Sequence, residues 1–107
     1  MAQIVWREKA EQLFWAFVEY AGLEFGKTAA QRWQKERKAI EWRLAHYPES
    51  YPPEELLRRK DIIIRHCHLM NRRFKIIYYY DGSEDVVLVL DIWDTKRNPS
   101  ALIRRIK

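Results

Sequence analysis

The sequence contains little cysteine, glycine or proline: among 107 residues there are one Cys, three Gly and four Pro. The lone cysteine, Cys67, excludes a disulfide framework and a zinc site built from several cysteines. Because 48% of the residues are apolar, a disordered, collagen-like or low-complexity chain is also excluded. No apolar run approaches the ~18 residues of a membrane span. Arg7, Glu8 and Lys9 interrupt the first residues, so we expect no signal peptide, no membrane partner and a single cytoplasmic domain.

Positive charge is concentrated in the second half of the chain. Residues 1–57 hold 8 basic and 9 acidic side chains, a net charge of −1, whereas residues 58–107 hold 12 and 6, a net charge of +6. An excess of this kind is typical of proteins that bind a polyanion or an acidic protein. The alternative is an ordinary basic surface exposed to solvent, and charge alone does not decide between them.

The first half of the sequence predicts a short strand and two helices. Residues 2–6 are apolar and rich in strand formers. From Ala10 to Ala21 the apolar residues then recur with the helical period, and Gly22 is placed to end that helix. A second helix is expected after Gly26, with Thr28 and Gln31 at the spacing of a capping box and Pro48 as its stop. The short link between the helices predicts an antiparallel helical hairpin.

The second half predicts three antiparallel strands, at Asp61–Met70, Arg73–Tyr80 and Asp85–Asp94. Asn71 is suited to the first turn, and Asp81-Gly82 is a strong signal for a hairpin because glycine accepts a positive φ. The fold class is therefore α+β, in the order β-α-α-β-β-β. The helical hairpin should pack on one face of a mainly antiparallel twisted sheet.

Alternation along the strands predicts which side chains lie on the other, open face of that sheet. In the last strand Val86, Leu88, Leu90 and Ile92 would face the core. The open face would then carry Arg73, Lys75, Tyr79, Asp91 and Trp93. Cations beside aromatic rings suit a nucleic-acid strand, because the cations bind phosphates and the rings stack on bases. A partner peptide lying across the sheet fits the same pattern.

His66 and His68 are two residues apart in a predicted strand, so both should lie on one face, with Cys67 in the core. Without a carboxylate close in sequence they are a weak signal for a metal. They are plausible proton carriers near neutral pH, and a solvated polar edge is the alternative. The sequence lacks a Gly-rich phosphate loop and the GxSxG and HExxH motifs, and we expect no cofactor and no metal.

Two further features point to the surface. The tail, residues 94–107, carries Lys96, Arg97, Arg104, Arg105 and Lys107, and its apolar residues could form one amphipathic turn that docks on the body. Trp15 and Trp42 fall outside the apolar stripes of their helices. Exposed tryptophans favour an interface, such as that of a homodimer or a partner complex. Partial cover by neighbouring Arg and Glu stems is the alternative.

Two motifs give the chain a family resemblance. Residues 73–78 (RFKIIY) resemble the "YRIIY" strand of the RelE/ParE superfamily of bacterial toxins, and residues 91–99 (DIWDTKRNP) resemble its "FWDTRxNP" ending. The predicted order of elements is similar to that family across the whole chain. The resemblance implies the toxin of a type II toxin–antitoxin system, neutralised by a cognate antitoxin, with either a toxin–antitoxin hetero-oligomer or a homodimer as the assembly.

The resemblance also implies candidate site residues. RelE-like members are mRNA endonucleases that act in the ribosome, whereas ParE-like members inhibit DNA gyrase without catalysis. By alignment with the strand motif, Lys75 takes the place of a conserved arginine, and Arg97, or Lys96, takes that of a C-terminal basic residue. The candidate catalytic residues are His66, His68, Lys75 and Arg97. The candidate residues for binding RNA or a partner are Arg65, Arg72, Arg73, Tyr79, Trp93, Lys96, Arg104 and Arg105.

Two departures from the family pattern bear on the mechanism. Lys75 replaces a bidentate guanidinium with a point charge. The tail has neither Tyr nor His after Asp94, so His66 or His68 would have to move the proton, or charge stabilisation alone would have to suffice. RNA cleavage on the ribosome is our first expectation. Inhibition of gyrase, or a degenerate member that binds antitoxin without toxicity, are the alternatives.

Overall fold

The elements follow one another in the order predicted from the sequence, with one short additional helix at each end of the second half. The computed structural model describes residues 1–106, so that Lys107 of the predicted tail lies outside the described residues. The elements are β1 (Gln3–Trp6), α1 (Glu8–Phe25), α2 (Lys27–His46), η1 (Glu55–Leu57), β2 (Ile64–Leu69), β3 (Phe74–Asp81), β4 (Val86–Asp94) and α3 (Pro99–Ile106).

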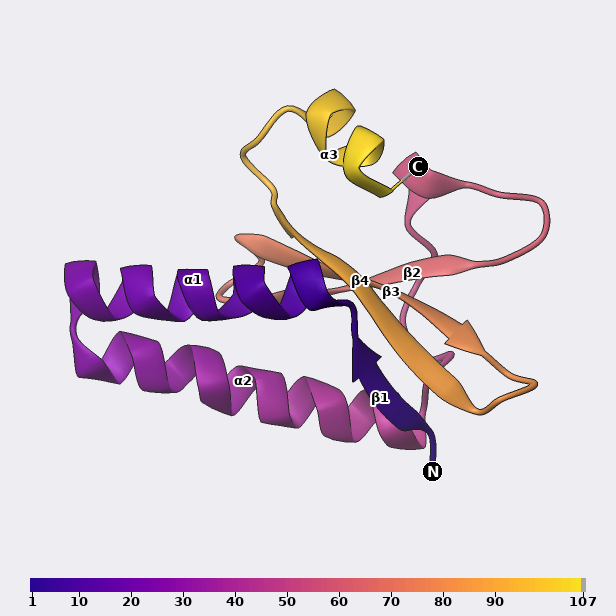
Figure 1. Cartoon of the computed structure of the whole chain (residues 1–107), viewed down its shortest axis with the longest axis horizontal. Helices are drawn as coiled ribbons and strands as arrows, with labels where there is room; N and C mark the ends of the chain where they lie inside the picture. The colour runs from indigo at the N-terminus through magenta and orange to yellow at the C-terminus, as the bar shows by residue number, and fades with distance from the viewer. Residues whose placement is uncertain (107) are drawn as a thin grey trace.

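The helical hairpin is tighter than expected. Helix α1 does not end at Gly22 but continues to Phe25, and Gly26 alone separates it from α2. Gly26 has φ 95°, in the left-handed region that favours glycine, which allows the chain to reverse in one residue. The predicted capping box is wrong: Gly26 is the N-cap of α2, and no side chain bonds to that end. Figure 1 shows α1 and α2 running antiparallel, side by side.

The four strands form one sheet in the order β1-β4-β3-β2. β1 is parallel to β4, and the other pairs are antiparallel, so the sheet is mainly antiparallel as predicted. Asn71 has φ 57° in the turn between β2 and β3, as expected for a turn former. In the next hairpin the residue with positive φ is Asp85, at 54°, and not Gly82 as the sequence indicated.

The face of the sheet that carries the helical hairpin, called here the helical face, holds the larger core. Phe14 of α1 and Trp33 of α2 pack there against Ile76 and Tyr78 of β3 and Val89 of β4. Phe14, Ile76, Tyr78 and Val89 have no exposed surface. The aromatic rings of Phe14 and Trp33 meet edge to face with centroids 6.1 Å apart. This packing explains why the hairpin and the strands form a single unit.

Because of a β-bulge in β4, the side chains of its first residues lie on the faces opposite to those predicted. Ile77 lies opposite Asp91 and Tyr78 opposite Val89, so that Leu90 has no partner on β3. Val87 and Val89 therefore face the helical hairpin in place of Val86, Leu88 and Leu90. Beyond the bulge the prediction holds, because Ile92 is in the helical core and Trp93 is on the other face. In β3 the side chains alternate between the two faces of the sheet as predicted.

The second face of the sheet, expected to be open, is partly covered. Helix α3 and the single turn η1 lie over it and build a smaller core from Leu57, Ile64, Ile77, Trp93 and Leu102. The amphipathic turn predicted in the tail is thus present, with Leu102 buried. In Figure 1, α3 lies on the opposite side of β4 from α1 and α2. Within residues 1–106 no helix is both long and apolar enough to cross a bilayer.

Candidate active site on the second face of the sheet

The two histidines of β2 lie on the second face, where this strand runs toward the turn to β3. The rings of His66 and His68 are 5.1 Å apart and nearly perpendicular. Cys67 points to the helical core and is 2% exposed, and burial raises the pKa of its thiol to about 12. The thiol is therefore inert filler, and the imidazoles are the chemically useful groups of this strand.

A carboxylate that the sequence did not predict as part of the site lies beside them. The segment 52–54 runs along the outer edge of β2: Glu54 N donates to Ile64 O at 2.7 Å, and His66 N donates to Pro52 O at 3.1 Å. This pairing turns the Glu54 side chain over the second face, where it is 2% exposed. Its signal in the sequence was slight, because the carboxylate lies twelve residues before His66 in a proline-rich connector.

Glu54 joins two of the predicted catalytic residues. Its Oε1 accepts a hydrogen bond from Lys75 Nζ at 2.7 Å and lies 3.2 Å from His66 Nδ1. The approach to His66 lacks hydrogen-bond alignment, and His66 Nδ1 is a buried nitrogen without a hydrogen-bond partner in residues 1–106. A buried polar atom left unpaired is costly and is typical of functional sites. We call Glu54, His66, His68 and Lys75 the polar cluster.

Both imidazoles of the polar cluster favour their neutral form. Burial lowers the pKa of His66 below its ordinary value of 6.5; Lys75 and Arg72 lower it further, and Glu54 opposes them. Burial also lowers the pKa of His68, with Arg72 as the next cause. A neutral imidazole can accept a proton at neutral pH. Burial, supported by the neighbouring cations, thus favours the protonation state that a general base requires.

Arg72 and Arg97 lie near the polar cluster, and Lys96 precedes Arg97 in the chain. The turn containing Arg72 lies against the end of β4, because Thr95 N donates to Arg73 O at 2.9 Å. Arg97 and Lys75 line the same small cavity, of about 70 Å³, at the foot of α3. Arg72, Lys96 and Arg97 are exposed, and none has an ion-pair partner within residues 1–106. These three cations are therefore available to an anionic ligand.

Other predicted binding residues are engaged in the fold. Arg73 makes a bidentate pair with Asp94, at 3.0 and 3.2 Å, which lowers the pKa of that carboxyl. Arg105 of α3 holds Asp91 of β4 at 2.9 and 3.1 Å. Trp93 is 2% exposed and donates its Nε1–H to Asp91 at 3.0 Å. These residues fix β4 and α3, and they are not free to contact a ligand.

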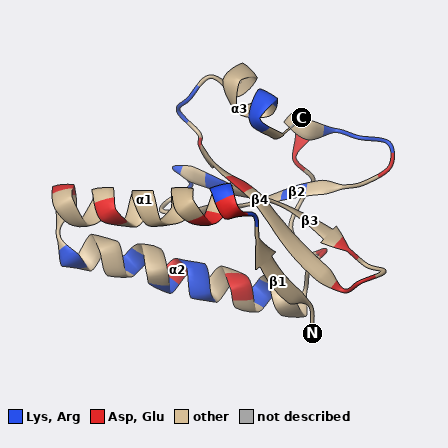
Figure 2. Cartoon of the chain, in the orientation of Figure 1, with Lys and Arg blue, Asp and Glu red and all other residues tan. Residues whose placement is uncertain are grey.

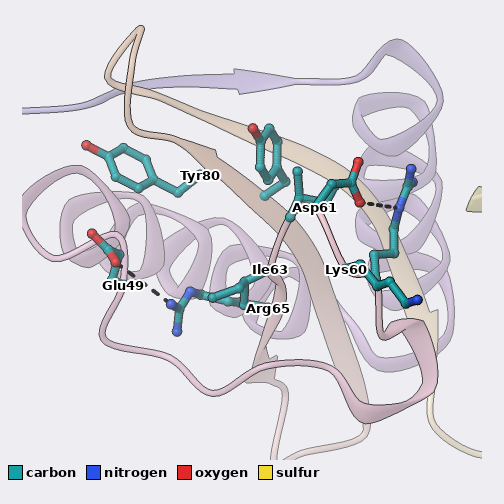
Figure 3. A pocket seen from close by; sticks show the side chains of 9 residues that line it. Glu49, Lys60, Asp61, Ile63, Arg65 and Tyr80 are labelled. Atoms are coloured by element: carbon teal, nitrogen blue, oxygen red, sulfur yellow. Dashed lines mark ion pairs between the residues drawn. The ribbon is translucent and has the colours of Figure 1, made fainter.

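The remaining three predicted binding residues lie away from the polar cluster. Arg65 donates to Tyr51 O at 2.7 Å and lies 3.9 Å from Glu49. Tyr79 is half-buried, and Arg104 is exposed on α3. Arg65 and Tyr79 line a separate hollow of about 410 Å³ (Figure 3). That hollow carries no histidine, and Figure 3 shows its two carboxylates, Glu49 and Asp61, in ion pairs with arginines, so it offers no proton acceptor comparable to the cluster.

The arrangement suits chemistry on a phosphodiester. Cations bind the phosphate and stabilise charge that develops on it, and a neutral imidazole removes a proton from the attacking hydroxyl. Within residues 1–106 no group of three or more His, Cys, Asp or Glu is arranged to hold a metal ion.

Comparisons with known proteins give one family model and several solved structures that are similar to the chain. Residues 4–99 match the family model described as the ParE toxin of the type II toxin-antitoxin system parDE. The isolated RelE toxin of E. coli aligns over 100% of both chains, with a TM-score of 0.58 and 17% identity. No curated protein sequence matches the chain.

Two toxin–antitoxin complexes contain similar folds. The intact RelBE complex of E. coli matches over 91% of this chain and 100% of the other, with a TM-score of 0.55 and 16% identity. The archaeal RelE–RelB complex from Pyrococcus horikoshii matches over 91% and 98%, with a TM-score of 0.54 and 13% identity. The structural likeness confirms the α+β fold predicted from the sequence.

Proposed function

The chain belongs to the ParE toxin family of type II toxin–antitoxin systems, and from this premise we propose that it stops growth by cleaving mRNA on the ribosome. The polar cluster would be the catalytic site. The observation that carries the proposal is the pair of imidazoles held neutral beside Lys75 and Arg72. A surface that only docked on a protein would not need half-buried histidines with lowered pKa values.

We infer the cleavage step from the chemistry that these side chains can perform. His68, the less buried imidazole, takes the proton of a ribose 2′-hydroxyl, and the resulting oxyanion attacks the adjacent phosphorus. The bond from phosphorus to the 5′-oxygen breaks, and this oxygen takes a proton from solvent. The products are a 2′,3′-cyclic phosphate and a 5′-hydroxyl end.

Other residues in and around the cluster would position the mRNA and stabilise the transition state. Lys75 and Arg97 line one cavity and would hold the phosphate oxygens as negative charge builds up in the transition state. Glu54, at 2.7 Å from Lys75 Nζ, would aim the ammonium group at the phosphate. Arg72 and Lys96 would bind flanking phosphates of the mRNA.

Inhibition of DNA gyrase is the second candidate function, and the match of residues 4–99 to a ParE model favours it. Under this reading the second face would be a docking surface, and the exposed cations Arg72, Lys96 and Arg97 would contact gyrase or its DNA. The proton chemistry of His66 and His68 would then be irrelevant to growth arrest. The two candidates therefore differ in what they expect of conservative histidine substitutions.

We also propose that the partner of the toxin is a cognate antitoxin that presents an acidic and apolar segment. The neighbours titled RelBE and RelE–RelB complexes support this proposal. A groove of about 520 Å³ between α1, β4 and α3 has a suitable lining: Leu13, Ala16 and Leu90 are apolar and Arg7 and Lys9 are cationic, whereas Arg105 is paired there with Asp91. High salt should weaken the charged part of that contact while the apolar part persists.

Pulse labelling after induction of the chain without its antitoxin tests the proposed function. Incorporation of amino acids should stop within the first minutes, before incorporation of thymidine. His68→Gln should abolish the arrest, whereas Lys60→Gln, which removes a distant cation, should leave it unchanged. Earlier loss of DNA synthesis, insensitive to His68→Gln, would favour gyrase. Loss of neither would mean a degenerate member that binds antitoxin without toxicity.

A further inference from the structure

The two long helices carry opposite charges, which a comparison of the two halves of the sequence conceals. Helix α1 holds four Glu and one Lys, a net charge of −3. Helix α2 holds six Lys or Arg and two Glu, a net charge of +4. Figure 2 shows basic residues in successive turns of α2. The excess of positive charge is therefore not confined to the second half of the chain.

The two carboxylates of α2 point away from its outer surface and are occupied. Glu41 accepts hydrogen bonds from Trp6 Nε1 at 2.8 Å and lies 3.5 Å from Arg37. Glu36 accepts from Arg32 at 2.7 Å and from the backbone N–H of Met70 at 2.7 Å. Neither carboxylate is left to neutralise the outer surface of the helix.

The outer face of α2 is a row of exposed polar and cationic side chains. With 3.6 residues per turn, the residues on this face are Lys27, Gln31, Gln34, Lys35, Lys38, Trp42 and His46. All seven are exposed. Within residues 1–106 the three lysines have no ion-pair partner and the face has no carboxylate. Gln31, Gln34, Lys35 and Lys38 line a shallow hollow of about 230 Å³, which presents only donors and amides to a ligand.

An aromatic platform follows the lysines one turn further along. Trp42 is 58% exposed, and the ring of His46 stacks on it with centroids 4.2 Å apart and planes 22° apart. His46 Nδ1 lies 2.8 Å from Trp42 O, which fixes the imidazole in this stack. Tyr47, 59% exposed, lies 6.2 Å from Trp42. A large ring held in place at the surface offers a stacking surface with little loss of side-chain entropy.

The lysines of α2 do not serve the stability of the helix. Lys27 is the first helical residue, there is no acidic residue in the first turn, and no side chain caps this end. A cation at a helix N-terminus opposes the helix dipole. Helix α1, by contrast, begins with Glu8 and Glu11. The sequence of α2 thus lacks the acidic first turn that stabilises the N-terminus of α1. Such a local loss of helix stability is expected where a surface is selected for binding.

We propose that the outer face of α2 is a second nucleic-acid contact, separate from the polar cluster, which binds a single-stranded segment of RNA. Lys27, Lys35 and Lys38 hold successive backbone phosphates. Trp42, supported by His46, stacks on an unpaired base at the end of the row. Lys38 and Trp42 are four residues apart, so a phosphate and its neighbouring base can be held on the same face of the helix.

The aromatic platform is what favours RNA over an acidic protein as the occupant. Lysines alone would bind either polyanion, but a rigid stack of Trp42 and His46 has its best counterpart in the flat face of a base. Unpaired bases expose that face, whereas bases within a duplex do not. The proposal does not depend on which target the toxin poisons, because it concerns a surface without residues of the polar cluster.

Binding of a fluorescein-labelled single-stranded RNA 12-mer, 2′-O-methylated so that it cannot be cleaved, tests the proposal by anisotropy. The double variant Lys35→Gln/Lys38→Gln should bind at least tenfold more weakly than wild type at low salt. Its slope of log affinity against log salt should fall by about 1.4, because each lost phosphate contact on a single strand removes about 0.7. The matched control Arg59→Gln/Lys60→Gln, which removes two exposed cations of the loop before β2, should retain the wild-type slope.

Trp42 provides the second arm of the test. Trp42→Ala should weaken binding of the 12-mer about tenfold with an unchanged salt slope, and Trp42→Phe should recover part of the loss. Circular dichroism confirms that these variants remain folded. A duplex RNA should bind without sensitivity to Trp42.

Three results would overturn the proposal: equal effects of Lys35→Gln/Lys38→Gln and of its control on RNA binding, no effect of Trp42→Ala, or poly-glutamate binding with the same sensitivity to Trp42. His68→Gln should not change the Trp42 contribution. Failure of this surface is thus distinguishable from failure of the catalytic site.

Discussion

The two faces of the sheet bury different kinds of side chain. On the helical face, Phe14, Trp33 and Tyr78 pack in a dry core whose one buried hydroxyl, that of Tyr78, donates to Pro48 O at 2.7 Å. The second face holds both carboxylates that are buried in residues 1–106, Glu54 and Asp91, and each binds a cation. Because burying an ion pair gains little stability over apolar packing, stability resides mainly on the helical face.

The two buried carboxylates also differ from each other. Asp91 is fully satisfied: it accepts hydrogen bonds from Ile92 N, Trp93 Nε1 and Arg105, and so acts as a structural anchor for α3. Glu54 accepts from Leu56 N, where it caps η1, and from Lys75 Nζ, and it lies beside His66 Nδ1, which has no aligned partner within residues 1–106. Asp91 thus connects β4 with α3, whereas Glu54 connects η1 with two residues of the proposed catalytic site.

Removal of the largest ring on the helical face should have the greatest effect. Phe14→Ala empties a site with no exposed surface and should lower the free energy of unfolding by about 3–5 kcal/mol. Urea denaturation measures the change. As a control, Leu23→Ala, on the same helix at 79% exposure, should stay within about 0.5 kcal/mol of wild type. A loss below about 1 kcal/mol for Phe14→Ala would mean that this face does not carry the stability.

Substitutions in the ion pair of Glu54 and Lys75 should affect stability and activity differently. Glu54→Leu leaves the largely buried Lys75 ammonium unpaired and should cost about 1–3 kcal/mol of unfolding free energy. Adding Lys75→Met should recover most of that loss, since an apolar pair replaces the ion pair. Growth arrest should be absent in both variants. A double variant that is folded and fully toxic would exclude the polar cluster from the mechanism.

Asp91→Asn should loosen α3 without affecting the helical hairpin. The bidentate contact with Arg105 weakens, and we expect a loss of about 1 kcal/mol. Amide hydrogen exchange should accelerate in residues 99–106 and remain unchanged in α1. Equal acceleration in both segments would show that α3 is not a separately anchored layer.

The smallest expected effect is a dependence of stability on pH. The pKa values of His66 and His68 are lowered in the folded chain, so the unfolded chain binds more protons as the pH falls below 6.5. The free energy of unfolding should therefore decrease from pH 7.5 to 5.5. Urea titrations of wild type and His66→Gln/His68→Gln should differ in this slope. Identical slopes would contradict the lowered pKa values.

The sequence predicted the order of elements well because each has its own period and its own boundary signals. It failed at β4, since this strand is apolar on both faces and its pattern cannot reveal the bulge at Leu90. Glu54 was missed because its position depends on backbone hydrogen bonds between residues 52–54 and β2. The pattern of the sequence does not reveal such a long-range contact. For α3, the sequence predicted an amphipathic turn that docks on the body, but it did not predict the face of the sheet that this turn covers.

Mapping of mRNA cleavage in a reconstituted translation system tests the central claim most directly. The purified wild-type chain should cut ribosome-bound mRNA and leave 5′-hydroxyl ends detectable by primer extension. His68→Gln should slow cleavage by about 10²- to 10⁴-fold, and Lys60→Gln should cut at the wild-type rate. An intact mRNA with wild-type chain, together with inhibited supercoiling by purified gyrase, would contradict the account. So would a His68→Gln chain that cuts as fast as wild type.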